Sequence, residues 1–144
     1  MNMPDGRAYE YEHTVGFQET NLVGNVYFAH PVAWQGRCRE LFLRDEAPEV
    51  LEELANGLQL LTARCSCEYL SELRAFDRVA VRMRLVKMSL NRLVLGFEYW
   101  RVGREPDELV ARGEQEVVCM RAGAEGPMAT PIPDALSRAL QRYR

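Results

Sequence analysis

Residues 27–46, YFAHPVAWQGRCRELFLRDE, decide the fold, because apolar residues recur there with the spacing of one long helix. Small alanine and glycine residues lie between the large ones, which indicates close packing against a sheet. Proline is tolerated in the first turn of a helix but not in its interior. The regular helix is therefore predicted to begin shortly before Pro31. A second, shorter helix is predicted over 47–57, where Gly57 would end it.

The segments around these helices alternate as strands do. Residues 9–17 alternate tyrosine and valine with charge, and His13 within them is interpreted as a half-exposed structural residue. Four antiparallel strands are predicted after the helices, and the long helix can bury its apolar face only on the concave side of the resulting five-stranded sheet. This predicts an α+β fold. The four segments are 58–73, 77–88, 92–102 and 108–121, with a short amphipathic helix at 134–144.

Composition limits the protein class. A chain of 144 residues with 47% hydrophobic content fits one domain, residues 1–144, with a flexible tail over residues 1–8. A net charge of −3 argues against a nucleic-acid-binding protein. No apolar run could span a membrane and no signal-peptide core is present, which predicts a cytoplasmic protein. The four cysteines lack paired CxxC loops, so no metal site and no disulfide framework are expected.

Residues 18–25, QETNLVGN, join the first strand to the long helix and are rich in short polar side chains. Asn21 cannot be a general base at neutral pH, but its amide can hold a carbonyl group or orient a water molecule. Glu19 is the only carboxylate in the loop, and it is either an alternative base or a cap. Simple turn formation by Asn21 and Asn25 remains the competing interpretation.

A family resemblance covers nearly the whole chain. Residues 15–43 resemble the opening motif of hotdog-fold thioesterases of the 4-hydroxybenzoyl-CoA type, and 68–85 and 109–121 resemble the later strands of that family. The likeness is sharper to the thioesterases of enediyne polyketide biosynthesis, in ETNLVGNVYF, WQGRCRELFL, CSCEYLSEL and LVARGEQ. It implies a hotdog fold, thioester hydrolysis, and no metal or cofactor. A helix tyrosine used in the enediyne group would fall at Pro31, where this chain departs from the pattern.

The resemblance also implies catalytic residues. Most family members have an aspartate at the position of Asn21, whereas asparagine is usual in the enediyne group, where it acts with an arginine that matches Arg39. The backbone N–H of Phe28 is the implied oxyanion donor, as helix-start N–H groups are unpaired and partly positive. Arg39 would stabilise negative charge on the carbonyl or on a β-keto acid. An ordinary surface ion pair with Glu40 or Glu46 is the alternative for Arg39.

The implied substrate is a β-ketoacyl or polyene chain on the acyl carrier protein domain of an iterative polyketide synthase, and decarboxylation could follow. A general acyl-CoA thioesterase and a non-catalytic acyl-binding protein are the alternatives. Family likeness implies a homotetramer, a dimer of dimers, with sites between subunits. Positive charge on the later strands would suit an acidic carrier protein, although a solvated face explains it equally. The predicted substrate-binding residues are Glu19, Asn25, Tyr27, His30, Thr62, Arg64 and Glu68.

Overall fold

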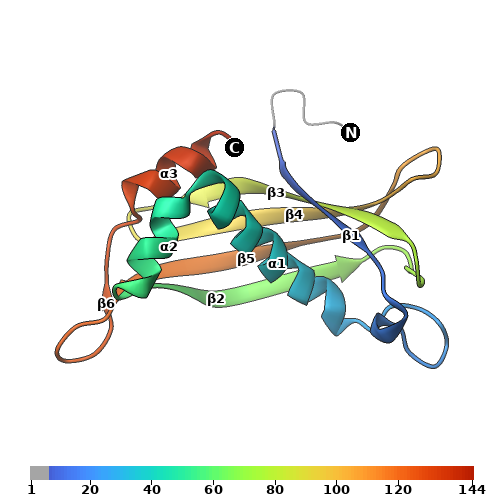
Figure 1. The fold of residues 1–144 in the computed structure, drawn as a ribbon, viewed down its shortest axis with the longest axis horizontal. Helices are drawn as coiled ribbons and strands as arrows, with labels where there is room; N and C mark the ends of the chain where they lie inside the picture. Colours follow the sequence, from blue (N-terminus) through green and yellow to red (C-terminus); the bar gives the residue numbers. More distant parts are fainter. Residues whose placement is uncertain (1–6) are drawn as a thin grey trace.

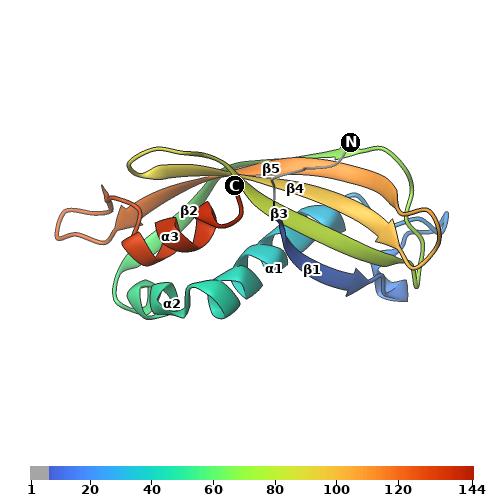
Figure 2. The same ribbon diagram turned by 90° about the horizontal axis from the view of Figure 1, so that it is seen from above.

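Residues 7–144 are described by the computed structural model, in which a curled antiparallel sheet holds a long helix against its concave face (Figure 1). All three helices lie on one side of the sheet (Figure 2). The predicted α+β arrangement is confirmed. Most of the predicted tail, residues 1–6, lies outside the described residues. The elements are β1 (Tyr9–Thr14), the 3-10 turn η1 (Phe17–Glu19), α1 (Ala29–Glu46), α2 (Pro48–Ala55), β2 (Leu58–Tyr69), β3 (Arg78–Met88), β4 (Arg92–Val102), β5 (Glu108–Arg121), β6 (Met128–Ala129) and α3 (Asp134–Gln141).

The five long strands pair in the order β1-β3-β4-β5-β2, all antiparallel, so β1 and β2 form the two edges. The short β6 pairs with β5 in a segment that was predicted to be a plain connection. β1 ends at Thr14, earlier than predicted, because the chain turns into η1 at Phe17. Helix α1 begins two residues before Pro31, as predicted.

The core lies between α1 and the concave face of the sheet. Trp34, Cys38 and Phe42 of α1 are at most 3% exposed, and they pack with buried residues of the strands, such as Phe97 and Tyr99. Each fully buried side chain of this size contributes about 1.5 to 3 kcal/mol relative to an exposed one. Helix α3 adds its own apolar residues to this core at one end of the sheet (Figure 2).

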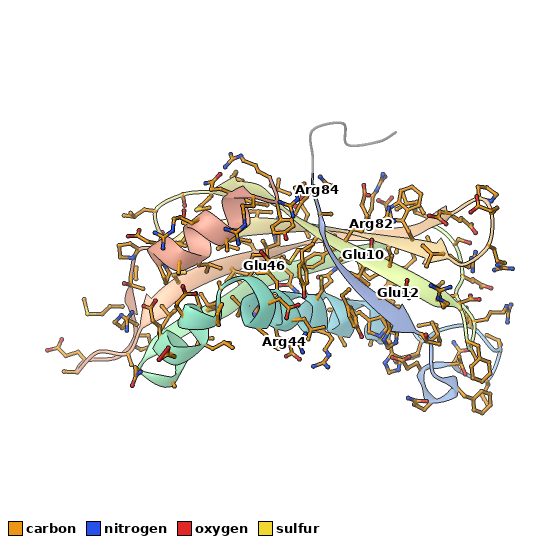
Figure 3. All side chains as sticks on the ribbon, turned by 45° about the horizontal axis from the view of Figure 1, so that its top comes forward. Glu10, Glu12, Arg44, Glu46, Arg82 and Arg84 are labelled. Atoms are coloured by element: carbon orange, nitrogen blue, oxygen red, sulfur yellow. The ribbon has the colours of Figure 1, made fainter. Side chains whose placement is uncertain are left out.

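The convex face carries a row of alternating charge that crosses all five strands. Glu10, Arg82, Glu98, Arg112 and Glu68 are consecutive register partners from β1 to β2. The outer members form ion pairs, with Arg82 Nε 3.0 Å from Glu10 Oε1 and Arg112 Nε 2.8 Å from Glu68 Oε1. Figure 3 shows Glu10 and Arg82 side by side on their neighbouring strands. We call these five residues the charge row.

Strand β2 is a long open edge. It pairs with β5 on one side only within the described residues, and positions 61–66 are all exposed. The pairing register skips Ala63, which makes a β-bulge between Thr62 and Arg64. An exposed edge of this length presents unpaired N–H and C=O groups to any added strand.

Candidate active site

The loop between η1 and α1 is a small hairpin. The Tyr27 N–H donates to the Glu19 carbonyl at 2.9 Å, and the Asn21 N–H donates to the Asn25 carbonyl at 2.9 Å. The turn at its tip includes Gly24, whose φ of +92° favours glycine. We call residues 19–27 the elbow hairpin. Its two arms carry Asn21 and lead into Phe28, so the hairpin controls how these two groups are placed.

Asn21 has both a turn-forming and a free end. Its Oδ1 accepts a hydrogen bond from the Val23 N–H at 3.0 Å, which is the turn role considered above. Its amide nitrogen has no acceptor in the described part of the chain, and the residue is exposed. The side chain is therefore oriented by its own turn while its donor group remains available to a ligand.

The start of α1 offers a free backbone donor. Phe28 is the N-cap residue, and no acceptor for its N–H is found among residues 7–144. Its carbonyl accepts a hydrogen bond from the Tyr69 hydroxyl of β2. Loss of hydration raises the pKa of Tyr69 to about 12, so this hydroxyl remains a donor at neutral pH. Tyr69 could be considered from the sequence only as one of several aromatic residues able to line an acyl channel, because its proximity to Phe28 depends on the fold.

A cavity of about 260 Å³ opens beside Phe28. Pro31 forms part of its wall, and the Tyr99 hydroxyl donates to the Pro31 carbonyl at 2.6 Å. Asn25 lines the cavity and donates through Nδ2 to Glu72 Oε2 at 3.0 Å. Since a carboxylate only accepts, this bond fixes the amide orientation, and the buried Asn25 Oδ1 is left without a protein donor. The other lining residues are Val26, Tyr69, Ser71, Leu73, Val110 and Ala111.

Glu19 is an anchor, with both carboxylate oxygens in use. Oε1 accepts from the Gly16 N–H and faces His13 Nε2, each at 2.8 Å, and Oε2 accepts from Trp34 Nε1 at 2.9 Å. Burial alone would raise the pKa of Glu19, but these hydrogen bonds outweigh it and hold the pKa below its usual value. His13 was interpreted as structural from the sequence, and Trp34, which could have lined an acyl channel, is instead a buried core residue.

Arg39 lies further along α1, away from the elbow hairpin. Its guanidinium donates to Thr62 Oγ1 at 2.9 Å and to Gln115 Oε1 at 3.0 Å, and burial lowers its pKa. The surface ion pair with Glu40 does not form, because Glu40 pairs with Arg37. Eleven residues of helix separate Arg39 from Phe28, roughly 16 Å at about 1.5 Å per residue. One chain therefore does not bring Arg39 to the elbow hairpin.

The remaining predicted substrate-binding residues lie on the surface. Arg64 Nε is 3.8 Å from Glu116 Oε1, and Glu68 belongs to the charge row. Tyr27 packs against Phe28 with ring centroids 4.7 Å apart. The His30 side chain has no hydrogen-bond partner within the described residues, and its ring lies 6.3 Å from that of Tyr27. His30 and Tyr27 thus stay near the helix start, as expected from the sequence.

Residues 7–144 hold no group of three or more His, Cys, Asp and Glu side chains arranged to bind a metal ion. None of their helices has the length and hydropathy of a membrane span. Most basic residues on β3 and β4 form ion pairs, so this positive charge is partly neutralised; the paired residues are Arg78, Arg82, Arg92 and Arg101.

The sequence model of the thioesterase-like superfamily matches residues 15–140. No curated protein matches the chain significantly. Among solved structures, the dynemicin thioesterase is 48% identical over 95% of this chain and 97% of that chain, with a TM-score of 0.93. Its crystal structures reveal induced-fit and allosteric effects upon polyene binding.

Two more distant structures are similar in fold alone. A 1,4-dihydroxy-2-naphthoyl-CoA thioesterase from Synechocystis is 21% identical over 94% of this chain and 96% of that chain, with a TM-score of 0.81. A 4-hydroxybenzoyl-CoA thioesterase mutant, complexed with 4-hydroxybenzoyl-CoA, is 15% identical over 93% of this chain and 99% of that chain, with a TM-score of 0.79.

Proposed function

Because the chain belongs to the thioesterase-like superfamily and is a thioester hydrolase, as its sequence predicted, we propose that it releases a polyketide chain from a carrier protein. The proposed substrate is a β-ketoacyl or polyene thioester on the acyl carrier protein domain of an iterative enediyne polyketide synthase. The similarity to the dynemicin thioesterase supports this choice, since that protein binds a polyene. Loss of carbon dioxide from the released β-keto acid would follow.

The unpaired Phe28 N–H beside the cavity is the single observation that carries the proposal. A thioester carbonyl that accepts from this donor would place its chain or its pantetheine arm against mainly apolar walls. One such donor is typically worth about 3 kcal/mol when negative charge develops on the carbonyl oxygen. The cavity of about 260 Å³ suits a slender chain rather than a bulky ligand.

The proposed nucleophile is water held by Asn21. The water oxygen bonds to the thioester carbon, and the carbonyl oxygen becomes an oxyanion that accepts from the Phe28 N–H. The C–S bond then breaks. The released acid contains the water oxygen and one water proton. The other water proton is transferred to the thiol of the pantetheine arm. No ionised side chain has to accept a proton, which fits the use of the Glu19 carboxylate as an anchor.

Arg39 would join this site from a second copy of the chain. Within one copy it is too far from Asn21, but two copies that pair along the β2 edge would set their α1 helices antiparallel. Arg39 of each would then approach the elbow hairpin of the other, and Thr62, Arg64 and Glu68 would lie along the shared β2 edge. A homotetramer built from two such dimers is the proposed assembly.

We expect Asn21→Ala and Arg39→Ala each to lower kcat roughly 100-fold, the usual cost of removing a charge-stabilising donor. Arg44→Ala is the matched control, since Arg44 lies on the same helix and bonds only Asp45. Hydrolysis is measured with β-ketoacyl-CoA and with the same acyl group on the carrier protein. Faster turnover of the carrier-bound form supports the proposed substrate, and equal turnover favours a general acyl-CoA thioesterase. If both variants match the wild type, the proposed catalytic roles are wrong.

A further inference from the structure

Three side chains near the end of β1 form a hydrogen-bond chain that the proposed reaction does not use. The Tyr11 hydroxyl lies 2.8 Å from His13 Nδ1, and His13 Nε2 lies 2.8 Å from Glu19 Oε1. The His13 ring packs against Trp34 of α1, with ring centroids 4.5 Å apart. We call Tyr11, His13 and Glu19 the β1 relay.

The chemistry of the groups fixes the direction of each link. Glu19 is ionised near neutral pH because its pKa is lowered, so its oxygens only accept. His13 Nε2 must therefore carry a hydrogen and donate. In the neutral ring Nδ1 is then an acceptor, and the Tyr11 hydroxyl donates to it. For a neutral ring this leaves one consistent arrangement, which sets both the tautomer and the orientation of the imidazole.

The relay ends at the residue on which the elbow hairpin depends. The Glu19 side chain ties the hairpin to β1 and to α1, while the Glu19 carbonyl accepts from the Tyr27 N–H, one residue before Phe28. The tip has weaker support: the side chains of Leu22 and Val23 are 106% and 75% exposed, and the Val23 carbonyl accepts from Arg74 Nη1 at 3.4 Å. The Glu19 carboxylate therefore helps to set the placement of Asn21 relative to the Phe28 N–H, together with the contacts of Asn25 with Glu72 and of Val23 with Arg74.

We propose that His13 is a positioning residue for thioester hydrolysis, acting through Glu19 to fix the elbow hairpin, with Tyr11 setting the orientation of its ring. This inference rests on the proposed function. His13 is 19% exposed and does not touch the cavity beside Phe28, so it acts at a distance from the reacting groups. A strand histidine interpreted as structural from its sequence position thereby gains a role in the reaction.

Three variants test the relay in the full-length protein. His13→Ala removes both links, Tyr11→Phe removes only the hydroxyl, and His13→Gln keeps an N–H donor that can reach Glu19. Glu12→Gln is the control, because Glu12 lies on the same strand but pairs with Arg78 outside the relay. Each variant is assayed for kcat and KM with a β-ketoacyl-CoA. Amide hydrogen exchange at Asn21 and Tyr27 is measured in parallel.

We expect His13→Ala to lower kcat about 10- to 100-fold with little change in KM, since misplacement of reacting groups costs rate. Exchange at Asn21 and Tyr27 should speed up in the same variant. His13→Gln should recover most of both losses, and Tyr11→Phe should fall between. Wild-type kcat and exchange in His13→Ala would overturn the proposal, and so would a His13→Gln variant as impaired as His13→Ala.

The indole N–H signals in an NMR spectrum separate this proposal from the proposed function. Trp34 Nε1 donates to Glu19, whereas Trp100 Nε1 donates to Glu98 at 3.0 Å and serves as an internal reference. A shift of the Trp34 signal alone in His13→Ala, reversed in His13→Gln, supports the relay. If the wild type hydrolyses no thioester, the proposed function fails, while exchange and the Trp34 signal still decide whether the relay fixes the hairpin.

Discussion

Glu19, the only carboxylate on the elbow hairpin, has a structural role. The proposed reacting groups are instead the Asn21 amide, the Phe28 backbone N–H and the Arg39 guanidinium. Glu19 accepts from Gly16, His13 and Trp34, so most of its acceptor capacity is already used within the protein. Asn21 keeps a free amide nitrogen two residues away. The site therefore favours polarisation of an already reactive thioester over removal of a proton by an ionised base.

The pH dependence of stability should report the Glu19 anchor. Its pKa is lower in the folded chain than its ordinary value of 4.5, so its contribution is present above that pH and is lost as pH falls through the folded value. At about pH 7 we expect Glu19→Gln to lower the free energy of unfolding by about 1 to 3 kcal/mol. Urea denaturation should show this difference shrinking as the pH falls below 4.5. A difference that stays constant with pH would contradict the anchor role.

At the scale of elements, α1 is joined to the edge strand β2 by three polar contacts in a line. Phe28, Gln35 and Arg39 lie on one flank of the helix and meet Tyr69, the Ser66 carbonyl and Thr62 in turn. Gln35 is fully buried, and its Nε2 donates to the Ser66 carbonyl at 2.9 Å. Polar contacts of this kind fix one register between helix and strand, where apolar contacts alone would allow sliding.

Gly113 of β5 makes this arrangement possible, and its replacement should be costly. A Cβ at Gly113 would overlap the Ser66 carbonyl oxygen and come within 2.6 Å of Gln35 Nε2. We expect Gly113→Ala to lower the free energy of unfolding by more than about 2 kcal/mol, measured by chemical denaturation. Gly96→Ala is the control, since its Cβ would meet only the Val86 side chain, which is 46% exposed and can move. Equal losses in both variants would show that the Gly113 contact is unimportant.

Local periodicity predicted the elements because each depends on neighbours along the chain. The start of α1 near Pro31 and the strands at 92–102 and 108–121 follow from spacing alone. The relay could not be predicted in this way. His13, Glu19 and Trp34 meet because β1 and α1 cross at the elbow, and Arg39 reaches Gln115 only through the β2–β5 register. Residue types in a loop indicate candidate chemistry, but contacts between distant segments decide their roles.

At the scale of the whole molecule, one chain leaves exposed the surfaces that the proposed site would share with a partner. The exposed β2 edge runs beside a groove along α1 whose lining includes Arg39, Leu51 and Leu60. The cavity beside Phe28 lies at the other end of the same helix. In the proposed assembly a single copy would hold two half-sites, and antiparallel pairing of two copies would complete both at once.

Ala63→Pro should separate the fold from this assembly. The β2–β5 register skips Ala63, so a proline there removes no register pair with β5, but it would obstruct a strand added along the open edge. We expect the variant to keep the wild-type circular dichroism spectrum, to sediment as a monomer, and to lose most thioesterase activity. A monomer with full activity would show that each chain works alone. An unchanged oligomer would place the interface elsewhere.

The charge row has a consequence for how the chain reaches this structure. A strand that slips by two residues keeps its faces, so burial of apolar side chains alone discriminates weakly against it. Glu114 follows Arg112 on the same face of β5, and one such slip of β4 or β2 would set Glu98 or Glu68 directly opposite Glu114. Opposed carboxylates are unfavourable, whereas the native register opposes each to a guanidinium. The charge row thus disfavours misregistered folding intermediates. Because salt screens the interactions between these charges, the refolding yield should fall as ionic strength rises.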